Sequence, residues 1–110
     1  MEVKLDRFKK GFRGVKKDLL KIIEHYGVRH QTTIWIEELS ELIKEICKWQ
    51  RHYEEWERDL PSENYENMTK EMADVENILE QMKIVLNNND KVQYERNKKN
   101  KRELERIKNE

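Results

Sequence analysis

The sequence predicts an all-α protein, a bundle of about four helices that is completed by oligomerisation. The chain of 110 residues holds only 3 glycines and 1 proline, too few for the many turns of a β-sandwich or a glycine-rich α/β fold. Its apolar residues recur at spacings of three and four, the period of an amphipathic helix. Because only 35% of the residues are hydrophobic and 42% are charged, so short a chain buries little apolar surface alone. We therefore expect a homo-oligomer, either a dimer or a tetramer.

The predicted helices follow one another with short connections. We assign residues 1–15 to a basic N-terminal lead-in and residues 16–110 to the helical domain. The first helix is predicted over residues 15–26, with Gly27 in the position that a helix C-terminus favours. The second is predicted from Gln31 to Arg58, because its apolar residues form a heptad seam. The members of this seam are Trp35, Leu39, Leu42, Ile46, Trp49, Tyr53 and Trp56.

Two further helices complete the prediction. The stretch from Pro61 to Asn64 indicates a loop, and the third helix is predicted from Asn67 to Leu86. Asp90 with Gln93 has the spacing of a capping box that opens a fourth, strongly basic helix.

Charge and composition exclude several classes of protein. Residues 1–29 carry a net charge of +5, residues 30–90 of −9 and residues 91–110 of +4. An acidic middle between basic ends is not typical of a DNA-binding surface, so no nucleic acid is expected as a partner. No run of about 18 apolar residues would span a membrane, and residues 1–14 lack the apolar stretch of a secretory signal. The single cysteine fits a reducing, cytoplasmic location.

Two helices carry acidic residues on the side that they are predicted to bury. On the third helix Glu71 lies inside the apolar arc and Asp74, one turn on, lies at its edge. On the second helix Glu38 and Glu41 repeat this arrangement. A carboxylate in an apolar stripe is costly unless it is paired or coordinated. Four converging carboxylates therefore predict a Mg²⁺ site, with Mn²⁺ as the alternative, since these are hard oxygen ligands. The competing interpretation is that the acids are only charges at the edge of a coiled-coil seam.

The same residues resemble a known family. Residues 37–42, Glu-Glu-Leu-Ser-Glu-Leu, and residues 71–75, Glu-Met-Ala-Asp-Val, are similar to the EExxE and ExxD motifs of the MazG-like, all-α nucleoside triphosphate pyrophosphohydrolases. Lys99 and Arg102 match the KxxR of the closing helix in these proteins. The similarity covers about residues 16–108, and the stretch from Asp74 to Met82 resembles the small phage and prophage members. Many relatives have a basic residue where this chain has Ile34, which is a departure from the pattern.

The resemblance implies a hydrolase that converts an NTP or dNTP to the monophosphate and pyrophosphate, as nucleotide-pool housekeeping, with Mg²⁺ as cofactor. It implies that metal is held by four carboxylates, and we assign the general base to one of them, Glu41. Lys99 and Arg102 would bind phosphate oxygens. Candidate contacts to the substrate base are Gln31, Trp35 and Tyr94, although the two aromatic residues are also plausible core residues. The metal ligands in this interpretation are Glu38, Glu41, Glu71 and Asp74.

Two other functions stay open at this point. One is a non-enzymatic, oligomerising helical interaction module, whose acids would border a seam. The other is a nucleic-acid binder that uses the basic ends, for which binding would depend steeply on salt.

Overall fold

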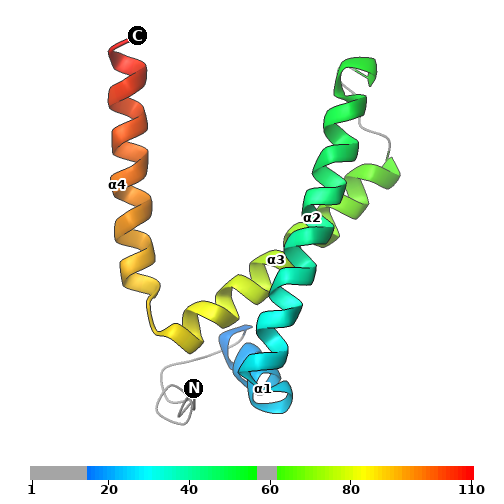
Figure 1. Cartoon of the computed structure of the whole chain (residues 1–110), viewed down its shortest axis with the longest axis vertical. Helices are drawn as coiled ribbons and strands as arrows, with labels where there is room; N and C mark the ends of the chain where they lie inside the picture. Colours follow the sequence, from blue (N-terminus) through cyan, green and yellow to red (C-terminus); the bar gives the residue numbers. More distant parts are fainter. Residues whose placement is uncertain (1–14, 57–61) are drawn as a thin grey trace.

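The computed structural model describes residues 15–56 and 62–110, and the side chains of residues 16–51 and 64–110. Within these ranges every regular element is a helix, and Figure 1 shows their arrangement. The all-α prediction with four helices is therefore confirmed for the described part of the chain. The predicted lead-in lies outside it, apart from Val15. The helices are α1 (Val15–Tyr26), α2 (Val28–Trp56), α3 (Ser62–Leu86) and α4 (Asn89–Lys108).

Gly27 separates α1 from α2, as predicted. Its φ of 87° lies in the left-handed region, which glycine adopts without the steric cost of a Cβ. Its N–H donates to the Ile23 carbonyl at 2.8 Å and closes α1. Its own carbonyl accepts from the Gln31 N–H at 3.1 Å. Because this one residue makes the whole turn, α2 begins at Val28 rather than at Gln31.

The start of α3 differs from the prediction. The helix begins at Ser62. Of the four residues predicted to form the loop, 61–64, the last three therefore belong to the first turn of α3. Serine and glutamate are well tolerated at a helix N-terminus, and Asn64 gains a partner on α2 that is described below. The predicted end of α2, Arg58, lies outside the described residues.

The connection from α3 to α4 is made by asparagines. Asn87 has a φ of 50°, and its N–H donates to the Ile84 carbonyl at 3.2 Å. The N–H of Asn88 donates to the Lys83 carbonyl at 3.4 Å. This pair of bonds is the Schellman arrangement, and asparagine is the residue that replaces glycine most readily in it.

The predicted capping box at the start of α4 is wrong. The helix begins at Asn89, and Asn88 before it makes no side-chain cap. The third helical position is therefore Lys91, which cannot accept a hydrogen bond from a backbone N–H. Gln93 lies further along and donates to Asn97 at 3.3 Å instead.

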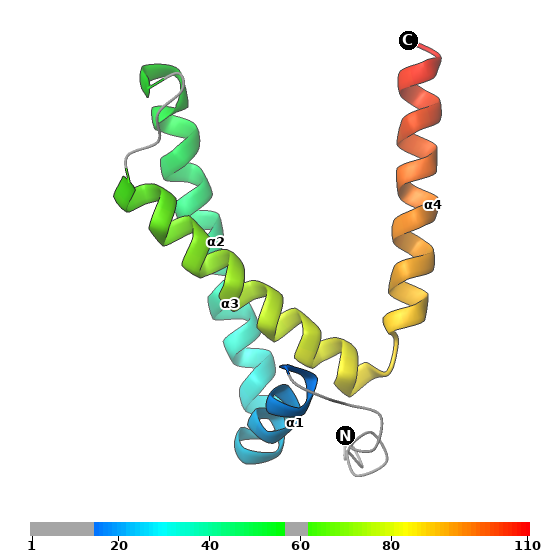
Figure 2. The same ribbon diagram turned by 180° about the vertical axis from the view of Figure 1, so that it is seen from behind.

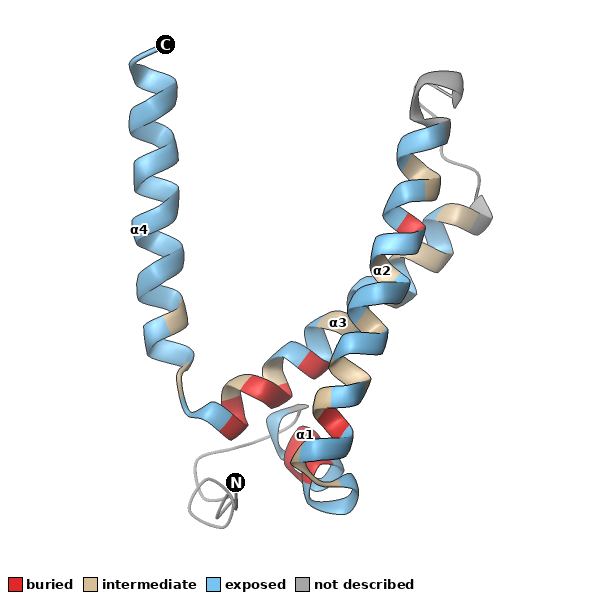
Figure 3. Cartoon of the chain, in the orientation of Figure 1, coloured by how far each residue is buried: buried red, intermediate tan, exposed pale blue. Residues whose placement is uncertain are grey.

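The core lies where α1 crosses the N-terminal half of α2 and the C-terminal half of α3. Figure 3 shows most of the buried positions gathered in this region. Leucine and isoleucine side chains of α1 enter the space between the two longer helices, where removing their surface from water supplies most of the stabilisation. The buried residues are Leu19, Leu20, Ile23, Ile78, Met82, Ile84 and Val85, with Val28, Ile34 and Trp35 packed against them.

The predicted seam of α2 is divided between two faces. Trp35, Leu42 and Trp49 are half-buried, whereas Leu39 and Ile46 are exposed. The last two members of the seam have side chains outside the described set. A single neighbouring helix covers a stripe narrower than the apolar arc of α2, so part of the arc remains in contact with solvent. Among the described helices, none has the length and hydropathy that crossing a membrane requires.

The helix α4 stands apart from the other three, as both views show (Figures 1 and 2). None of its residues is buried, and all its side chains except that of Val92 are exposed. The radius of gyration is 17.7 Å, compared with about 13 Å for a compact domain of this length. The described chain therefore consists of a three-helix body and one projecting helix.

Candidate metal centre

The candidate site lies between α2 and α3, which pack against each other more extensively than any other pair of described helices. The two helices run antiparallel and cross, with α2 nearer the viewer in Figure 1 and α3 nearer in Figure 2. Residues that face the partner helix on each of them therefore meet at the crossing. These include acidic residues as well as apolar ones.

Three carboxylates converge at this crossing. One oxygen each of Glu38 on α2 and of Glu71 and Asp74 on α3 lies within 4.8 Å of the other two. Glu38 and Glu71 are half-buried and Asp74 is exposed. Glu71 and Asp74 are three residues apart on one helix, so their side chains lie on the same surface one turn apart. We refer to these three residues as the carboxylate cluster.

One oxygen of the cluster has no partner. Oε2 of Glu71 is buried, and no hydrogen-bond donor in the described part of the chain reaches it. A buried carboxylate oxygen without a donor or a cation costs free energy, because it has lost its hydration without replacement. The position is therefore one at which a bound cation or a proton would stabilise the structure.

The surroundings favour neutralisation of the cluster. The pKa of Glu71 is raised by burial first, and then by the negative charges of Asp74, Glu41 and Glu45. Burial likewise raises the pKa of Glu38, followed by the charges of Asp74 and Glu71. Both effects disfavour the ionised form. A divalent cation would reverse them, because it supplies the charge that the ionised carboxylates lack.

Glu41 does not join the three converging carboxylates. It is exposed, although its charge contributes to the raised pKa of both Glu38 and Glu71. The prediction of four converging acids is thus met by three, with the fourth close enough to act electrostatically. Glu41 is three residues from Glu38 and lies at the edge of the buried face, so its side chain remains in solvent.

Gln31 lies two turns from the cluster and is buried. Its Nε2 donates to Oε1 of Gln81 on α3 at 2.7 Å, and its Oε1 lies 2.8 Å from Nδ1 of His30. The His30 ring in turn stacks on Tyr26, with ring centroids 4.8 Å apart. The predicted substrate contact therefore has both ends of its amide engaged within the fold, and it would bind a substrate only after giving up these bonds.

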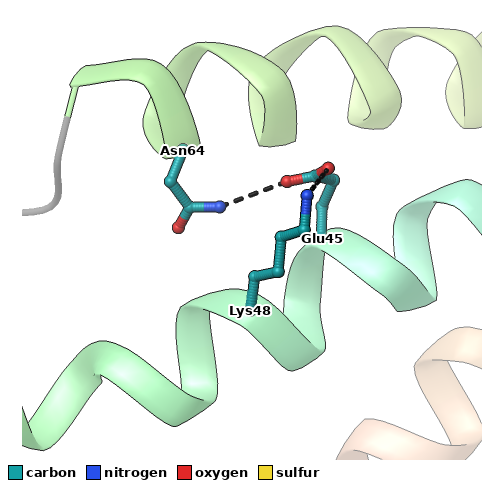
Figure 4. Close-up of polar contacts among 3 residues, drawn as sticks. All are labelled: Glu45, Lys48 and Asn64. Atoms are coloured by element: carbon teal, nitrogen blue, oxygen red, sulfur yellow. Dashed lines mark hydrogen bonds and ion pairs between the residues drawn. The ribbon is translucent and has the colours of Figure 1, made fainter.

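On the other side of the cluster lies a third polar contact between the helices. Glu45 is buried on α2 and accepts hydrogen bonds from Asn64 Nδ2 at 3.2 Å and from Lys48 Nζ at 3.3 Å. Figure 4 shows Asn64 reaching from α3 towards Glu45, with Lys48 one turn along α2. Each oxygen of the Glu45 carboxylate thus has a donor, whereas Oε2 of Glu71 has none.

The polar residues between α2 and α3 are spaced seven residues apart along their helices, and this spacing was not used to predict the site. On α2 the polar positions 31, 38 and 45 are buried or half-buried, and Thr32 and Lys48 are half-buried outside this spacing. On α3 positions 64 and 71 are half-buried, and position 81, seven residues after the exposed Asp74, is buried. The expected carboxylates were found from their phase within the apolar arcs, whereas Asn64 and Gln81 were not singled out. The spacing itself was the signal, because side chains seven residues apart lie on nearly the same face of a helix.

The basic residues predicted to bind phosphate are not brought to the cluster. Lys99 and Arg102, like Tyr94, are exposed on α4, which stands apart from α2 and α3 (Figure 1). Trp35 packs against the core, in line with the alternative that it is a core residue. Within one chain, the carboxylate cluster therefore has no phosphate-binding cation from α4 near it.

The arrangement suits a hard divalent cation. Its donors are carboxylate oxygens, the ligand type that Mg²⁺ and Mn²⁺ take in proteins, and one of them is buried without a partner. The open side at Asp74 leaves room for water or for a ligand that shares the cation. No protein-family model matches the chain, and no curated protein or solved structure is significantly similar to it.

Proposed function

We propose that this protein is a Mg²⁺-dependent nucleoside triphosphate pyrophosphohydrolase, which converts an NTP or dNTP to the monophosphate and pyrophosphate. The observation that carries the proposal is the carboxylate cluster with its unpartnered, buried Glu71 oxygen. The order of its motifs along the chain, followed by the basic helix, supports the same assignment. Its role would be to remove unwanted nucleotides or to adjust a nucleotide pool.

The cluster residues have distinct roles in this proposal. Glu38, Glu71 and Asp74 hold the cation, with Mg²⁺ as the first choice and Mn²⁺ as the alternative. The bound metal would neutralise the triphosphate and lower the pKa of an attacking water. Glu41 is exposed beside the cluster and accepts the proton of that water, and it can also complete the metal ligands. Its carboxylate can act as a base because it is less buried than Glu71.

The phosphate-binding role of Lys99 and Arg102 requires a second copy of the chain. Both residues lie on a helix that is separate from the cluster of its own chain (Figure 2). We propose that the active form is a homo-oligomer in which α4 of one copy supplies these cations to the carboxylates of another. Guanidinium and ammonium groups would then stabilise charge on the leaving pyrophosphate.

A different function is favoured by a separate observation. Large apolar side chains are exposed on α2 and α3, which is typical of a protein interaction surface. A non-enzymatic, oligomerising helical module would explain this surface without any catalysis. It predicts that the chain associates but neither binds Mg²⁺ nor releases pyrophosphate. For either function, the single free cysteine, Cys47, is consistent with a reducing compartment such as the cytoplasm.

The direct test is a pyrophosphate-release screen over canonical and damaged NTPs and dNTPs with Mg²⁺. We expect release from at least one nucleotide, and a loss of about 100-fold or more in Glu38→Gln and Glu71→Gln, since removing even an outer-shell partner of a metal costs 10–100-fold. Glu76→Gln is the matched control, because this glutamate is exposed on α3 outside the cluster. The proposal fails if no nucleotide is hydrolysed, or if the two cluster variants retain full activity.

Metal binding can be tested without a substrate. We expect Mg²⁺ to raise the Tm of the native chain, because a ligand that binds only the folded state stabilises it. The same addition should leave the Tm of Glu71→Gln nearly unchanged, while Glu76→Gln should respond like the native chain. Equal shifts in all three proteins would show that the cation binds elsewhere.

A further inference from the structure

One side of the α2–α3 pair leaves the carboxylate cluster open to solvent. Glu41 and Asp74 lie three residues after Glu38 and Glu71, so each is turned by about 60° from the preceding glutamate, against the helix winding. Because α2 and α3 are antiparallel and face each other, the same turn in both helices leads to the same side of the pair. Glu41 and Asp74 are exposed there, and we call it the open side.

Three lysines share the open side with these acids. Lys44 follows Glu41 by three residues, Lys48 follows it by seven, and Lys70 precedes Asp74 by four. Helix phase therefore places all three lysines on or near the open side. They lie beyond the cluster in one direction only, towards the C-terminal end of α2 and the N-terminal end of α3. We call these three residues the lysine group.

The other end of the open side lacks such cations. In the described parts of α2 and α3, only Arg29 and Lys83 are basic beyond the cluster in that direction, apart from histidine. The phase of Arg29 directs it away from α3, and the phase of Lys83 turns it to the opposite side of the pair. Positive charge along the open side is therefore concentrated at the end that carries the lysine group.

Lys48 is held in a position that directs its ammonium towards the cluster. Its Nζ lies 3.3 Å from Oε1 of Glu45, which is one turn nearer the cluster along α2 (Figure 4). The negative charge of Glu45 contributes to the raised pKa of Glu71, so the partner of Lys48 acts electrostatically on the cluster. The lysine side chain thus extends along the helix towards the proposed metal ligands.

This ion pair can be exchanged for another anion at small cost. The Lys48 side chain is 40% exposed, and an ion pair that solvent reaches contributes little to stability. Glu45 keeps a donor on its other oxygen when Lys48 turns away, because Asn64 Nδ2 lies 3.2 Å from it. A phosphate group near the cluster could therefore accept the Lys48 ammonium as a charge-assisted donor.

Aromatic rings lie at the opposite end of the open side. His30 precedes Lys48 by eighteen residues, which is five full helical turns and places both on the same side of α2. The His30 ring stacks on Tyr26, with ring centroids 4.8 Å apart, and Tyr26 is 54% exposed. Exposed aromatic rings bind nucleobases by stacking. The open side thus has rings at one end, carboxylates in the middle and lysines at the other end.

We infer that a nucleotide lies along the open side with its terminal phosphates on the lysine group and its base on the Tyr26–His30 stack. This inference rests on the proposed function and adds the direction in which the substrate binds. It places the α-phosphate at the cluster beside Glu41, where the proposed attack by water takes place. It also gives the chain phosphate-binding cations of its own, which reduce the repulsion between the acidic site and the phosphate tail.

The first test is the binding of inorganic tripolyphosphate with Mg²⁺, measured by titration calorimetry on the full chain. Lys48→Met should weaken binding by about tenfold or more, because it removes a charge-assisted hydrogen bond. Lys48→Arg keeps the charge and should retain most of the affinity. Lys21→Met is the matched control, because this lysine is exposed on α1, and it should bind as tightly as the native chain.

Mg²⁺ alone separates phosphate binding from damage to the fold. Lys48→Met removes a positive charge near the cluster, so it should bind Mg²⁺ at least as tightly as the native chain. A structural defect would instead weaken the binding of both Mg²⁺ and tripolyphosphate. The double change Lys44→Met and Lys70→Met, at exposed positions, should also weaken tripolyphosphate binding, and it leaves the Glu45–Lys48 pair intact.

The base end is tested with nucleoside triphosphates that carry an imido group between the α- and β-phosphates and therefore resist cleavage there. Tyr26→Leu should weaken the binding of the best-bound analogue by about fivefold or more, as for the loss of one stacking contact, and should leave tripolyphosphate binding unchanged. Lys48→Met should weaken the binding of both ligands. Tyr65→Leu is the control, because this tyrosine is also exposed but lies on α3 near its N-terminal end.

Three results would overturn the inference. They are a native chain that does not bind tripolyphosphate with Mg²⁺, a Lys48→Met chain that binds it as tightly as the native chain, and a Tyr26→Leu chain that binds every analogue normally. None of these measurements uses hydrolysis. Expected binding without pyrophosphate release would keep the binding direction and refute the proposed activity. Pyrophosphate release that depends on Glu71 but not on Lys48 would do the reverse.

Discussion

At the scale of single residues, Glu71 distinguishes this helix pair from an ordinary one. Its half-buried carboxylate has one oxygen without a donor, and Glu38 and Asp74 lie close to it. In contrast, Glu45 is more buried but is paired with Asn64 and Lys48. Glu45 and Glu71 both lie between the two helices, but only Glu45 has a hydrogen-bond donor for each of its carboxylate oxygens. The difference identifies Glu71, rather than Glu45, as the residue with a buried oxygen that a cation or a proton would stabilise.

The raised pKa of Glu71 leads to a prediction about metal-free stability. Because its pKa is higher in the folded than in the unfolded chain, its contribution is most favourable below the ordinary pKa of glutamate and is lost as the pH rises through the raised value. Glu71→Gln removes this dependence. We expect the variant to match the native chain at low pH and to be the more stable of the two near pH 7.

This comparison is made by urea unfolding with EDTA at several pH values. Glu76→Gln, whose site is exposed, should follow the native chain at every pH. A Glu71→Gln chain that is equally or less stable throughout the range would show that the ionised carboxylate is satisfied in the free protein.

At the scale of elements, three polar layers fix the register of α3 against α2. The Gln31–Gln81 bond, the carboxylate cluster and the Glu45–Asn64 bond follow one another at intervals of seven residues, or about 10 Å along a helix. A buried polar pair in a helix seam favours the one register in which its partners meet. The two outer layers therefore hold Glu38 opposite Glu71 and Asp74.

We predict that the glutamine layer positions the carboxylates without touching a ligand. Gln31→Leu or Gln81→Leu alone removes the hydrogen bond between the two helices, leaves a buried amide group of the other glutamine without its partner, and should cost about 1–3 kcal/mol of stability. The double change to leucine should recover most of this loss, because no amide is then left unsatisfied. Chemical denaturation of the four chains measures both effects.

The Mg²⁺ affinity of the double leucine chain shows whether the glutamine layer positions the carboxylates or only stabilises the fold. If the layer sets the register, the double leucine chain should be stable but bind Mg²⁺ more weakly than the native chain, as seen by titration calorimetry. Unchanged Mg²⁺ affinity in that chain would assign the register to the apolar contacts instead.

At the scale of the whole molecule, a small core supports a large exposed surface. The buried residues lie where α1 meets α2 and α3, while the upper part of the helix pair and all of α4 have few buried side chains (Figure 3). In proteins, most of the stability of a helix comes from tertiary packing of one face rather than from helix propensity, and α4 has no buried residue. In the proposed oligomer, we expect α4 to gain stability from the surface that it contacts.

Hydrogen exchange provides the corresponding prediction. Amides of α4 should exchange rapidly in dilute protein and become protected as the concentration rises, because association gives α4 a surface to pack on. Amides around Leu20 and Ile23 in α1 should be protected at all concentrations, since these side chains are the most deeply buried. Rapid exchange of α4 at every concentration would contradict a packed role in an oligomer.

Much of this protein could be predicted from the sequence because helices are local. The period of apolar residues gave the first three helices, Gly27 gave the first turn, and the phase of Glu38 and Glu71 within the apolar arcs agreed with their half-buried positions. Boundaries that depend on a distant contact were missed, as at Asn64, which bonds to Glu45 nineteen residues away. The capping box failed for a local reason, because the helix begins two residues earlier than predicted and this shift changes which side chain can cap.

Only the tertiary structure decided which side chains meet. The phase of a helix indicates which of its residues share a face, but the register and crossing of two helices depend on side chains from both. The sequence therefore could not show that three of the four acids converge while Glu41 stays in solvent. It could not place α4 away from the body, because an isolated helix and a packed one have the same local period. Nor could it show which part of the α2 seam faces outward, since that depends on the surface that α3 covers.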